Sequence, residues 1–264
     1  MNVDAPIGVF DSGIGGLTVV KELMEIMPEE HLIYFGDTAR TPYGSRPAAE
    51  IIGFMRQILD FFAVQNVKMA VVACNTMTAL GLEMASKEYS FPLVGVNTGA
   101  DKVLEVSKSR KVGVIATQAT IASENHKKAI QSKDAAVFVY PAACPKLVPL
   151  IEQGQVEGAE LELAIAEYVL PMKNMGVDAV VLGCTHYPFV SSAIRKVIGD
   201  EITIIDPARE TAKQAQHILK QRQQLAAGPG KIRLCFSKDV ERAQKMAAMM
   251  FNTEKIKFEL VKLK

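Results

Sequence analysis

Short runs of apolar, often β-branched residues alternate along the chain with longer stretches that are apolar on one side only. This alternation predicts strands joined by crossover helices, and therefore parallel sheets of the α/β class. The predicted strands lie at residues 7–10, 32–35, 69–73, 93–96, 111–116, 136–140, 179–182, 203–205 and 232–236. The clearest helix start is Ser45-Arg46-Pro47, where Pro47 fits the first position of a helix over residues 48–65.

The order of segments repeats once along the chain. Residues 7–13 open a strand, a turn and a helix, and residues 112–117 open another such unit. Each opening is followed by a second apolar strand that ends in a cysteine, Cys74 in the first case and Cys184 in the second. Chance could produce such strands in a valine-rich chain, but the repeat favours two similar α/β units. Ligands of open α/β sheets bind at the carboxyl ends of strands, where both cysteines are predicted to lie.

Composition narrows the class of partner. The 264 residues include 30 Lys and Arg against 29 Asp and Glu, and the net charge of +1 argues against a nucleic-acid binder. The first residues lack a charged region followed by an apolar one, and no apolar run approaches the roughly 18 residues of a membrane helix. We therefore expect a cytoplasmic protein that binds a small molecule, with no membrane partner. The 4 cysteines show no CxxC pairing, so free thiols are expected rather than disulfides or a zinc site.

Cys74 and Cys184 are the candidate reactive groups. Each follows a predicted buried strand and precedes a predicted helix, where free N–H groups and the helix dipole favour a thiolate. Polar residues follow both of them, whereas Cys144 and Cys235 are expected to be ordinary core thiols. A Cys/His/Asp protease is an alternative, but it needs only one nucleophile and leaves the second cysteine unexplained.

Two polar segments follow the first two predicted strands. Residues 11–16, Asp-Ser-Gly-Ile-Gly-Gly, could receive a carboxylate or phosphate, but they match neither GxGxxG nor a P-loop, so nucleotide binding is disfavoured. Asp11 has two open roles, a helix cap or a catalytic group. The loop at residues 36–45 is rich in turn formers, and Arg40 within it is either a substrate contact or a solvated surface residue.

Polar residues outside these segments give weaker signals. By periodicity alone Glu152 is a surface residue. His31, His126 and His217 fall in polar surroundings without an acidic or cysteine partner nearby in sequence, so they too are expected at the surface.

Five segments carry a resemblance to a known family. They are Phe10-Asp11-Ser12-Gly13-Ile14-Gly15-Gly16, residues 34–44, Ala73-Cys74-Asn75-Thr76, residues 144–152 and Gly183-Cys184-Thr185-His186-Tyr187-Pro188. In content and order they resemble the glutamate racemase family of the aspartate/glutamate racemase superfamily.

The resemblance implies a fold and an activity. It implies two similar parallel-sheet α/β domains related by internal duplication, residues 1–97 with 208–264 and residues 98–207, with the active site in the cleft between them. The implied activity is racemisation of free glutamate without cofactor or metal, by two cysteines acting as acid and base, to supply D-glutamate for peptidoglycan. It further implies a homodimer and no nucleic-acid partner.

The resemblance also assigns roles to individual residues. Cys74 corresponds to the base for D-glutamate and Cys184 to the base for L-glutamate. The helpers are Asp11 near Cys74, and Glu152 with His186 near Cys184, which replaces the surface interpretation of Glu152. The residues at substrate-contacting positions are Asp11, Ser12, Tyr43, Gly44, Asn75, Thr76, Thr117, Thr120, Thr185 and His186.

The chain departs from the family pattern at residues 116–120, and also near residues 97–100 and 206–210, and three other functions stay open. Where the family often has Gly-Thr-x-Gly-Thr, this chain has alanine at Ala116 and Ala119 but keeps Thr117 and Thr120. The alternatives are an aspartate racemase, an amino-acid sensor without catalysis, and a redox protein in which Cys74 pairs with Cys184.

Overall fold

The predicted apolar runs form parallel strands that assemble into two sheets. The computed structural model describes residues 2–263. The strands are β1 (Ile7–Asp11), β2 (Leu32–Gly36), β3 (Met69–Val72), β4 (Leu93–Gly95), β5 (Lys111–Ala116), β6 (Phe138–Ala143), β7 (Ala179–Gly183), β8 (Thr203–Ile205), β9 (Ile232–Phe236) and β10 (Lys257–Leu260). One sheet has the order β10-β9-β2-β1-β3-β4 and the other β6-β5-β7-β8. All strand pairs are parallel, which confirms the predicted fold class.

Helices connect the strands, as a parallel sheet requires. They are α1 (Leu17–Ile26), α2 (Ala48–Val64), α3 (Asn75–Glu88), α4 (Ala100–Val106), α5 (Gln118–Ala122), α6 (Asn125–Lys133), α7 (Leu147–Glu152), α8 (Ala159–Asn174), the 3-10 helix η1 (Tyr187–Val190), α9 (Ser191–Ile198), α10 (Ala208–Gln221) and α11 (Val240–Ala248). None of the helices within residues 2–263 combines the length and the apolar character needed to cross a membrane.

The contacts divide the chain into two units. The first unit contains Met1–Val96 and Ala208–Lys264, and the second contains Asn97–Pro207. Both sheets share one strand order, because β2-β1-β3-β4 and β6-β5-β7-β8 each place the first strand of the unit between the second and the third. In both units a candidate cysteine follows the third strand, Cys184 directly after β7 and Cys74 with one residue between it and the end of β3. The predicted domain bounds, residues 1–97 with 208–264 and residues 98–207, stay a prediction.

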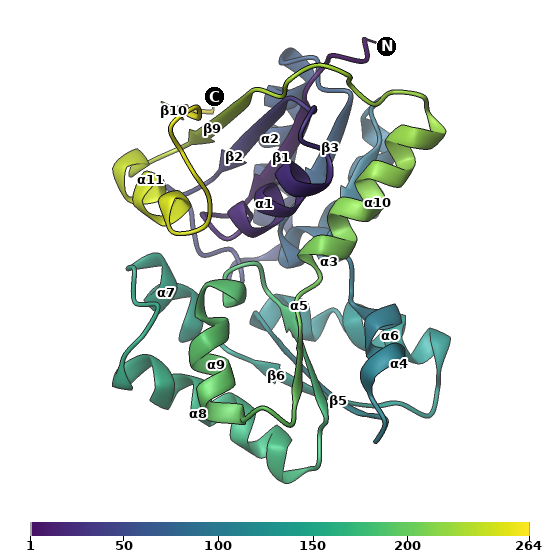
Figure 1. Cartoon of the computed structure of the whole chain (residues 1–264), viewed down its shortest axis with the longest axis vertical. Coiled ribbons are helices and arrows are strands. Elements are labelled where there is room, and N and C mark those ends of the chain that lie inside the picture. The colour runs from purple at the N-terminus through teal and green to yellow at the C-terminus, as the bar shows by residue number, and fades with distance from the viewer. Residues whose placement is uncertain (1, 264) are drawn as a thin grey trace. The chain divides into compact units, whose positions relative to one another are not determined.

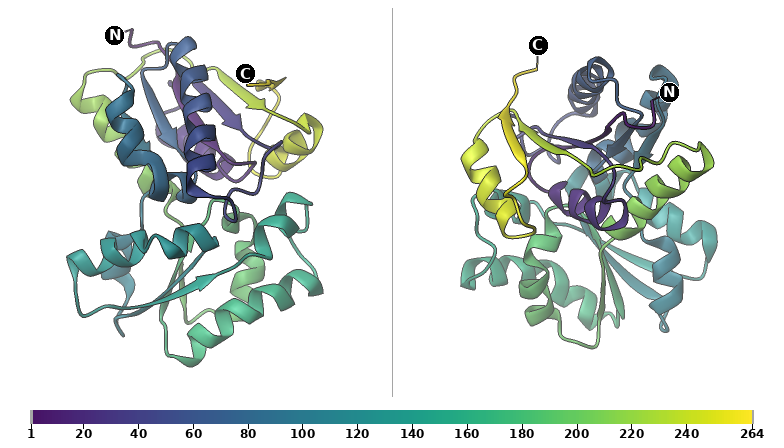
Figure 2. Two further views of the ribbon diagram at one scale, coloured as in Figure 1. Left: turned by 180° about the vertical axis from the view of Figure 1, so that it is seen from behind. Right: turned by 45° about the horizontal axis from the view of Figure 1, so that its top comes forward.

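Helices cover both faces of the first unit's sheet. Helices α1 and α10 pack together on one face (Figure 1), and α2 and α3 cover the other (Figure 2). Since both faces are covered, all five residues of β1 are buried, which is typical of a parallel sheet. Phe62 of α2 lies so close to the sheet that a Cβ on Gly8 would be 2.7 Å from its ring, and its ring centroid is 5.8 Å from that of Phe10.

The second unit is layered in the same way. Ile130 of α6 and Val103 of α4 pack against Val112 and Val114 on one face of the sheet. Helices α8 and α9 pack together and cover the other face, with Ile165 among their buried residues. Successive residues of β5 therefore alternate between two apolar cores.

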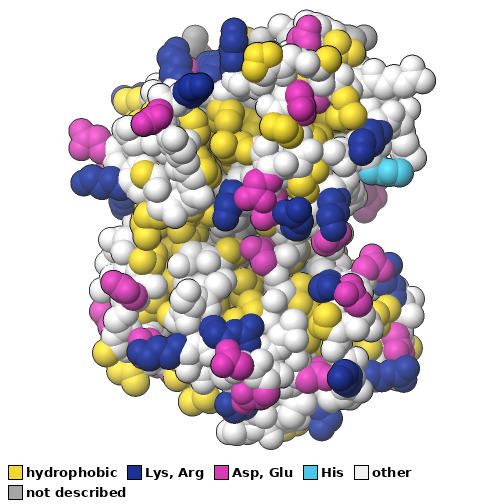
Figure 3. All heavy atoms as spheres, viewed as in Figure 1, with side chains coloured by type: hydrophobic (Ala, Val, Ile, Leu, Met, Phe, Trp, Pro, Cys, Tyr) yellow, Lys and Arg dark blue, Asp and Glu magenta, His cyan; other side chains and the backbone are white. Residues whose placement is uncertain are grey.

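Figure 3 shows acidic and basic side chains interspersed over the face that it draws, in both units. Among the described residues many of these charges are paired, as in Arg209 with Glu22 at 2.8 Å and Lys196 with Glu162 at 2.6 Å. The even balance of charge in the composition thus extends to local pairs on the surface.

Three details of the predicted elements were wrong. Strand β6 begins at Phe138 and runs through Pro141, although a strand was predicted at residues 136–140. Proline lacks an N–H donor, but β6 is an edge strand and does not need every donor. Strand β10 was missed, because its charged residues alternate with apolar ones over only four positions. Pro47 precedes α2 as its N-cap, with φ of −59° and ψ of 140°, rather than occupying the first helical position.

Candidate active site

The turn after β1 is built around the carboxylate of Asp11. Asp11 ends β1 and is fully buried. Its Oδ2 accepts a hydrogen bond of 2.8 Å from the backbone N–H of Gly16, the residue that precedes α1. A Cβ on Gly16 would lie 2.7 Å from Cβ of Asp11 and 2.9 Å from the ring of Tyr34, so the turn requires glycine there. Asp11 therefore stabilises the start of α1, although Gly16 occupies the cap position itself.

Cys74 lies beside this turn. It follows β3 and is the N-cap of α3, with an extended backbone. Its Sγ is 3.9 Å from Oγ of Ser12. Asn75 and Thr76 are buried in the first turn of α3. Unpaired N–H groups and the dipole at a helix N-terminus stabilise a thiolate, so this position suits a reactive cysteine.

Asp37 organises the polar loop after β2. Its carboxylate accepts hydrogen bonds from the hydroxyl of Tyr43, from Nε of Arg40 at 2.5 Å and from the hydroxyl of Ser237 at 2.8 Å. Arg40 is thus engaged within the protein, where the sequence left its role open. Burial raises the pKa of the Tyr43 hydroxyl far above its usual value and the Asp37 charge adds to this rise, so Tyr43 is a neutral donor.

Asp37 was missed in the sequence analysis. It sits directly after a parallel strand, which is the signal that pointed to Asp11. Tyr43 is 1% exposed and is fixed through Asp37, while Gly44 follows it in the same loop and is half-buried. Cys74 is close enough that a negative charge on its sulfur would raise the pKa of Tyr43 further. The loop after β2 and the cysteine after β3 therefore belong to one group of polar side chains in the first unit.

The second unit places three candidate groups in contact. Cys184 directly follows β7, and its Sγ is 3.8 Å from Nδ1 of His186. Nε2 of the same ring is 2.7 Å from Oε1 of Glu152, the last residue of α7. All three are buried, as is Thr185 between Cys184 and His186. The imidazole thus connects a thiol to a carboxylate through its two nitrogens.

His186 is held in its charged form by these neighbours. Burial alone lowers the pKa of a histidine, but the contacts with Cys184 and Glu152 outweigh it and raise the pKa of His186 well above its usual value. A protonated imidazole beside a thiol can donate a proton to sulfur or stabilise its negative charge.

Thr117 and Thr120 are paired at the end of β5. Thr117 is the N-cap of α5, and its Oγ1 is 3.0 Å from Oγ1 of Thr120. Thr120 is buried and Thr117 is half-buried. Ala116 and Ala119, which depart from the family pattern, lie in β5 and α5 with ordinary backbone conformations.

The other two cysteines are core residues. Burial raises the pKa of Cys144 to about 12 and that of Cys235 to about 11, so both thiols are protonated at neutral pH. Cys144 lies in the core of the second unit and Cys235 in that of the first.

The surface expectation for His126 was wrong, as was the interpretation of Glu152 from periodicity that the resemblance had already replaced. Glu152 is 7% exposed, against the interpretation from periodicity, because α7 is short and its last residue turns toward η1. His126 is 4% exposed and packs beneath the first turn of α6. Neither position gives a signal in the local sequence, since their burial depends on contacts with distant segments.

The predicted site residues form one group in each unit. Asp11, Ser12, Tyr43, Gly44, Cys74, Asn75 and Thr76 lie around the carboxyl ends of β1, β2 and β3. Thr117, Thr120, Glu152, Cys184, Thr185 and His186 lie around the carboxyl ends of β5 and β7. Each group contains one cysteine beside acidic or imidazole groups, which is an arrangement suited to proton transfer.

Known proteins are similar to this chain over most of its length. The sequence model of the Asp/Glu/Hydantoin racemase family matches residues 7–215. The glutamate racemase of Lysinibacillus sphaericus is 44% identical over 218 residues, which are 82% of this chain and 82% of that protein. A glutamate racemase isoform from Bacillus anthracis superposes with a TM-score of 0.91 at 35% identity, over 98% of both chains. The glutamate racemase of Francisella tularensis, solved in complex with D-glutamate, superposes with a TM-score of 0.89 at 35% identity, also over 98% of both chains.

Proposed function

The chain belongs to the Asp/Glu/Hydantoin racemase family, and from this premise we propose that it interconverts L-glutamate and D-glutamate by a two-cysteine mechanism. The observation that carries the proposal is the buried series of contacts from Glu152 through His186 to Cys184. The glutamate racemases to which the chain is similar support glutamate as the substrate.

Racemisation requires groups on both faces of the α-carbon. A base removes the α-proton from one face, and an acid returns a proton to the other face. A single base would return the proton to the face it came from. Two thiols meet the requirement if Cys74 acts on one face and Cys184 on the other, with one as thiolate and the other as thiol at the start of each turnover. The thiols then exchange protonation states when the product forms.

Cys184 acts as the base for L-glutamate in this proposal. After it takes the α-proton, the thiol must return to its starting state before the next L-glutamate binds. Protonated His186, 3.8 Å from the sulfur, stabilises the Cys184 thiolate in that starting state, and Glu152 at 2.7 Å stabilises the imidazolium. Burial of all three groups strengthens their electrostatic coupling.

Cys74 acts as the base for D-glutamate. Its position as the N-cap of α3 lies at the positive end of the helix dipole, which favours a thiolate. Asp11 is the acidic helper, held by the Gly16 N–H at the turn beside Ser12. The helper groups of the two thiols differ. Cys74 has a carboxylate, whereas Cys184 has an imidazole paired with a carboxylate, so protons reach the two thiols by different relays.

The remaining polar residues are assigned to substrate binding. Ser12, Tyr43, Gly44, Asn75, Thr76, Thr117, Thr120 and Thr185, with Asp11 and His186, supply hydroxyl, amide and backbone groups. Deprotonation places negative charge next to the α-carboxylate, and donors that are already fixed in place stabilise that charge without reorganisation. Every step uses groups of the chain itself, so the proposal requires no cofactor or metal.

The test follows the α-proton of glutamate by NMR in D2O. Purified protein with reductant and chelator is expected to remove the signal from both enantiomers and to convert each into the other. Cys74→Ser and Cys184→Ser are expected to abolish racemisation, because a hydroxyl is a much weaker acid than a thiol. Cys235→Ser is the matched control, since this thiol is buried in the core of the first unit and kept protonated. Full activity in either of the first two variants would disprove the two-thiol mechanism.

The same experiment separates the alternatives. Exchange with aspartate and not with glutamate would identify an aspartate racemase. Binding of D-glutamate without exchange would favour a sensor. Activity that consumes reductant and forms a disulfide between Cys74 and Cys184 would identify a redox protein.

We extend the proposal to the cell and to assembly on the strength of the family resemblance. The product D-glutamate would serve peptidoglycan synthesis in the cytoplasm, and the active form would be a homodimer. Loss of the encoding gene is expected to create a requirement for D-glutamate, and light scattering on the purified chain is expected to give twice the mass of one chain. Growth without D-glutamate, or the mass of a single chain in the active fraction, would contradict these two points.

A further inference from the structure

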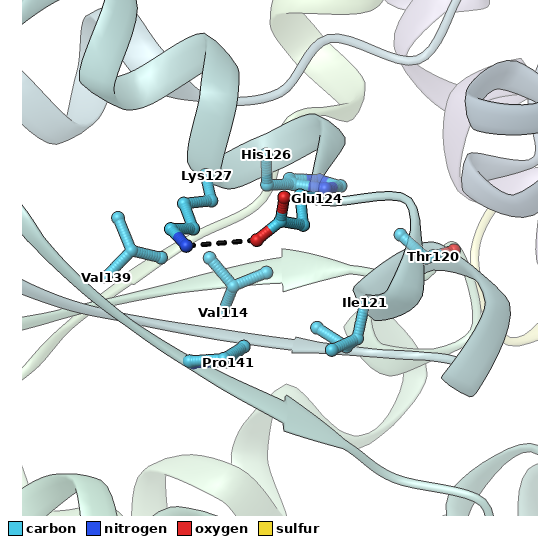
Figure 4. A pocket seen from close by; sticks show the side chains of 8 residues that line it. All are labelled: Val114, Thr120, Ile121, Glu124, His126, Lys127, Val139 and Pro141. Atoms are coloured by element: carbon cyan, nitrogen blue, oxygen red, sulfur yellow. Dashed lines mark hydrogen bonds and ion pairs between the residues drawn. The ribbon is translucent and has the colours of Figure 1, made fainter.

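A pocket of about 90 Å³ lies beneath α6 in the second unit. Figure 4 shows that Val114, Val139 and Pro141 line it from strands β5 and β6, and that Ile121 lines it from α5. These four side chains are apolar and give the pocket an apolar interior. We call it the α6 pocket.

A buried histidine lines the α6 pocket. His126 is 4% exposed, and neither of its ring nitrogens has a hydrogen-bond partner among the described residues. Figure 4 shows the ring beneath the start of α6, on the side of the pocket where Thr120 lies. Burial lowers the pKa of His126 to about 4, so the ring is neutral at neutral pH. A neutral imidazole offers one N–H donor and one nitrogen acceptor, and leaving buried polar groups without partners is costly.

Two charged residues stand at the edge of the α6 pocket. Lys127 Nζ and Glu124 Oε1 are 3.0 Å apart, drawn as a dashed line in Figure 4, and both side chains are roughly half-exposed. Because these charges neutralise each other, the edge attracts neither anions nor cations strongly. One imidazole and one carboxylate that is already paired are also fewer than the three protein ligands of a typical zinc site.

The α6 pocket adjoins the Cys184 group of residues. Thr120 lines the pocket and also pairs with Thr117 at 3.0 Å. On another side, the His126 ring carbon Cε1 would be 3.3 Å from a Cβ added to Gly183, the residue immediately before Cys184. A molecule in the pocket would therefore contact Thr120, which pairs with Thr117, and His126, which lies beside the residue that precedes Cys184.

We propose that the α6 pocket binds a small neutral molecule with an apolar body of a few carbon atoms and one group that both donates and accepts a hydrogen bond, such as an amide, with His126 as the recognition residue. The apolar walls bind the body, and either the N–H or the acceptor nitrogen of the His126 ring hydrogen-bonds to the polar group. A charged molecule of the same shape is excluded, because a neutral imidazole in an apolar pocket does not compensate the loss of its hydration.

The volume of the α6 pocket limits the size of the small molecule that can be used to test binding. An apolar cavity of about 150 Å³ holds benzene, so 90 Å³ with an open edge suits about five non-hydrogen atoms. Propionamide has that size, and propionate is its charged counterpart of nearly identical shape. For so few atoms the dissociation constant is expected to be on the order of tens of millimolar.

Binding is measured by NMR of the histidine side chains during titration to about 200 mM of each probe. Of the 4 histidines, only His126 is expected to shift saturably with propionamide, and none with propionate. The signal that is absent in His126→Phe is assigned to His126. Binding to this variant is measured from the NMR signals of the probe, and it is expected to be roughly tenfold weaker, because the variant keeps an aromatic ring but loses the hydrogen bond. His217→Phe removes an exposed histidine and is the matched control.

A second variant tests the location of binding even if His126→Phe does not fold. Ile121 is half-buried at the α6 pocket, so Ile121→Phe fills the pocket from its edge and is expected to abolish the His126 shift. No saturable shift of His126 in the unaltered protein would overturn the proposal. Equal shifts with propionate, or shifts that persist in Ile121→Phe, would overturn it as well.

An effect on turnover rests on the proposed function and is measured separately. Exchange of the glutamate α-proton is followed with increasing propionamide in the unaltered protein and in Ile121→Phe. We expect the rate in the unaltered protein to change by more than twofold, with the same midpoint as the NMR titration, and the rate in the variant to be insensitive. Binding without a change in rate would show that the pocket binds the probe but does not influence turnover. Absence of exchange before any propionamide is added would reject the racemase activity instead.

Discussion

Replacing Glu152 by glutamine tests the proton relay at Cys184. The substitution keeps the shape of the side chain but removes the charge that contacts His186 Nε2 at 2.7 Å. A hydrogen bond between charged groups contributes about 1.5–3 kcal/mol, which corresponds to roughly one to two units of pKa. The pKa of His186 is raised by its contacts with Cys184 and Glu152 against the effect of burial. It is therefore expected to fall by that amount in Glu152→Gln.

The sign of the pH effect follows from this change. The protonated form of His186 exists below its pKa and is lost as the pH rises through it. In Glu152→Gln the alkaline limb of the profile of kcat/KM against pH is therefore expected to move one to two units toward lower pH. The maximum of kcat/KM is expected to fall about 10- to 100-fold, since the variant retains both thiols and loses one relay group.

Thermodynamics supplies an internal check on the measurement. Glutamate enantiomers have equal free energies, so kcat/KM must stay equal in the two directions even when kcat and KM change separately. Initial rates from each enantiomer, measured by circular dichroism from about pH 6 to 10, give both values. Glu157→Gln is the control, because Glu157 is exposed and lies five residues away in sequence. An alkaline limb that stays in place in Glu152→Gln would refute the reasoning.

Three further predictions concern stability. Gly16→Ala is expected to destabilise the fold by about 1–3 kcal/mol in urea unfolding, because the added Cβ has no room. Gly53→Ala on α2 is the comparison: its added Cβ meets nothing within 4 Å, and the substitution is expected to stabilise the fold by about 0.5–1 kcal/mol. Lys68→Met removes the ion-pair partner of buried Glu30 at 2.5 Å and is expected to cost about 3–5 kcal/mol. A loss under 1 kcal/mol would contradict this. Since the pKa of His126 is about 4 when folded and near 6.5 otherwise, unfolding takes up protons and stability is expected to fall by about 3 kcal/mol from pH 6.5 to 4. Urea unfolding across this range should show a smaller loss in His126→Phe.

The sequence predicts the features that depend on neighbours along the chain. Strands β3 and β7 are apolar on both faces because parallel sheets are covered on both sides. Their ends are marked by a switch to polar residues, which is why Cys74 and Cys184 could be placed correctly after strands.

Hydrophobic periodicity did not predict features that depend on contacts between distant segments, and Glu152 was placed near Cys184 only through the family resemblance. Lys68 and Glu30 form a buried ion pair, but in sequence they look like any surface lysine and glutamate. His126 and Glu152 are buried by segments more than 30 residues away, Gly183 and His186 respectively. Hydrophobic periodicity indicates which face of an element is apolar, but it does not indicate which polar residues are covered by another element.

The discontinuous path of the first unit has a consequence for synthesis on the ribosome. Sheet β6-β5-β7-β8 has all of its strands once residue 205 has been made. Strand β2, in contrast, is made at residues 32–36 and keeps one open edge until β9, residues 232–236, emerges to pair with it. Because domains fold as the chain emerges, the second unit acquires its complete sheet first. Chains that end early expose the edge of β2, which is a template for aggregation.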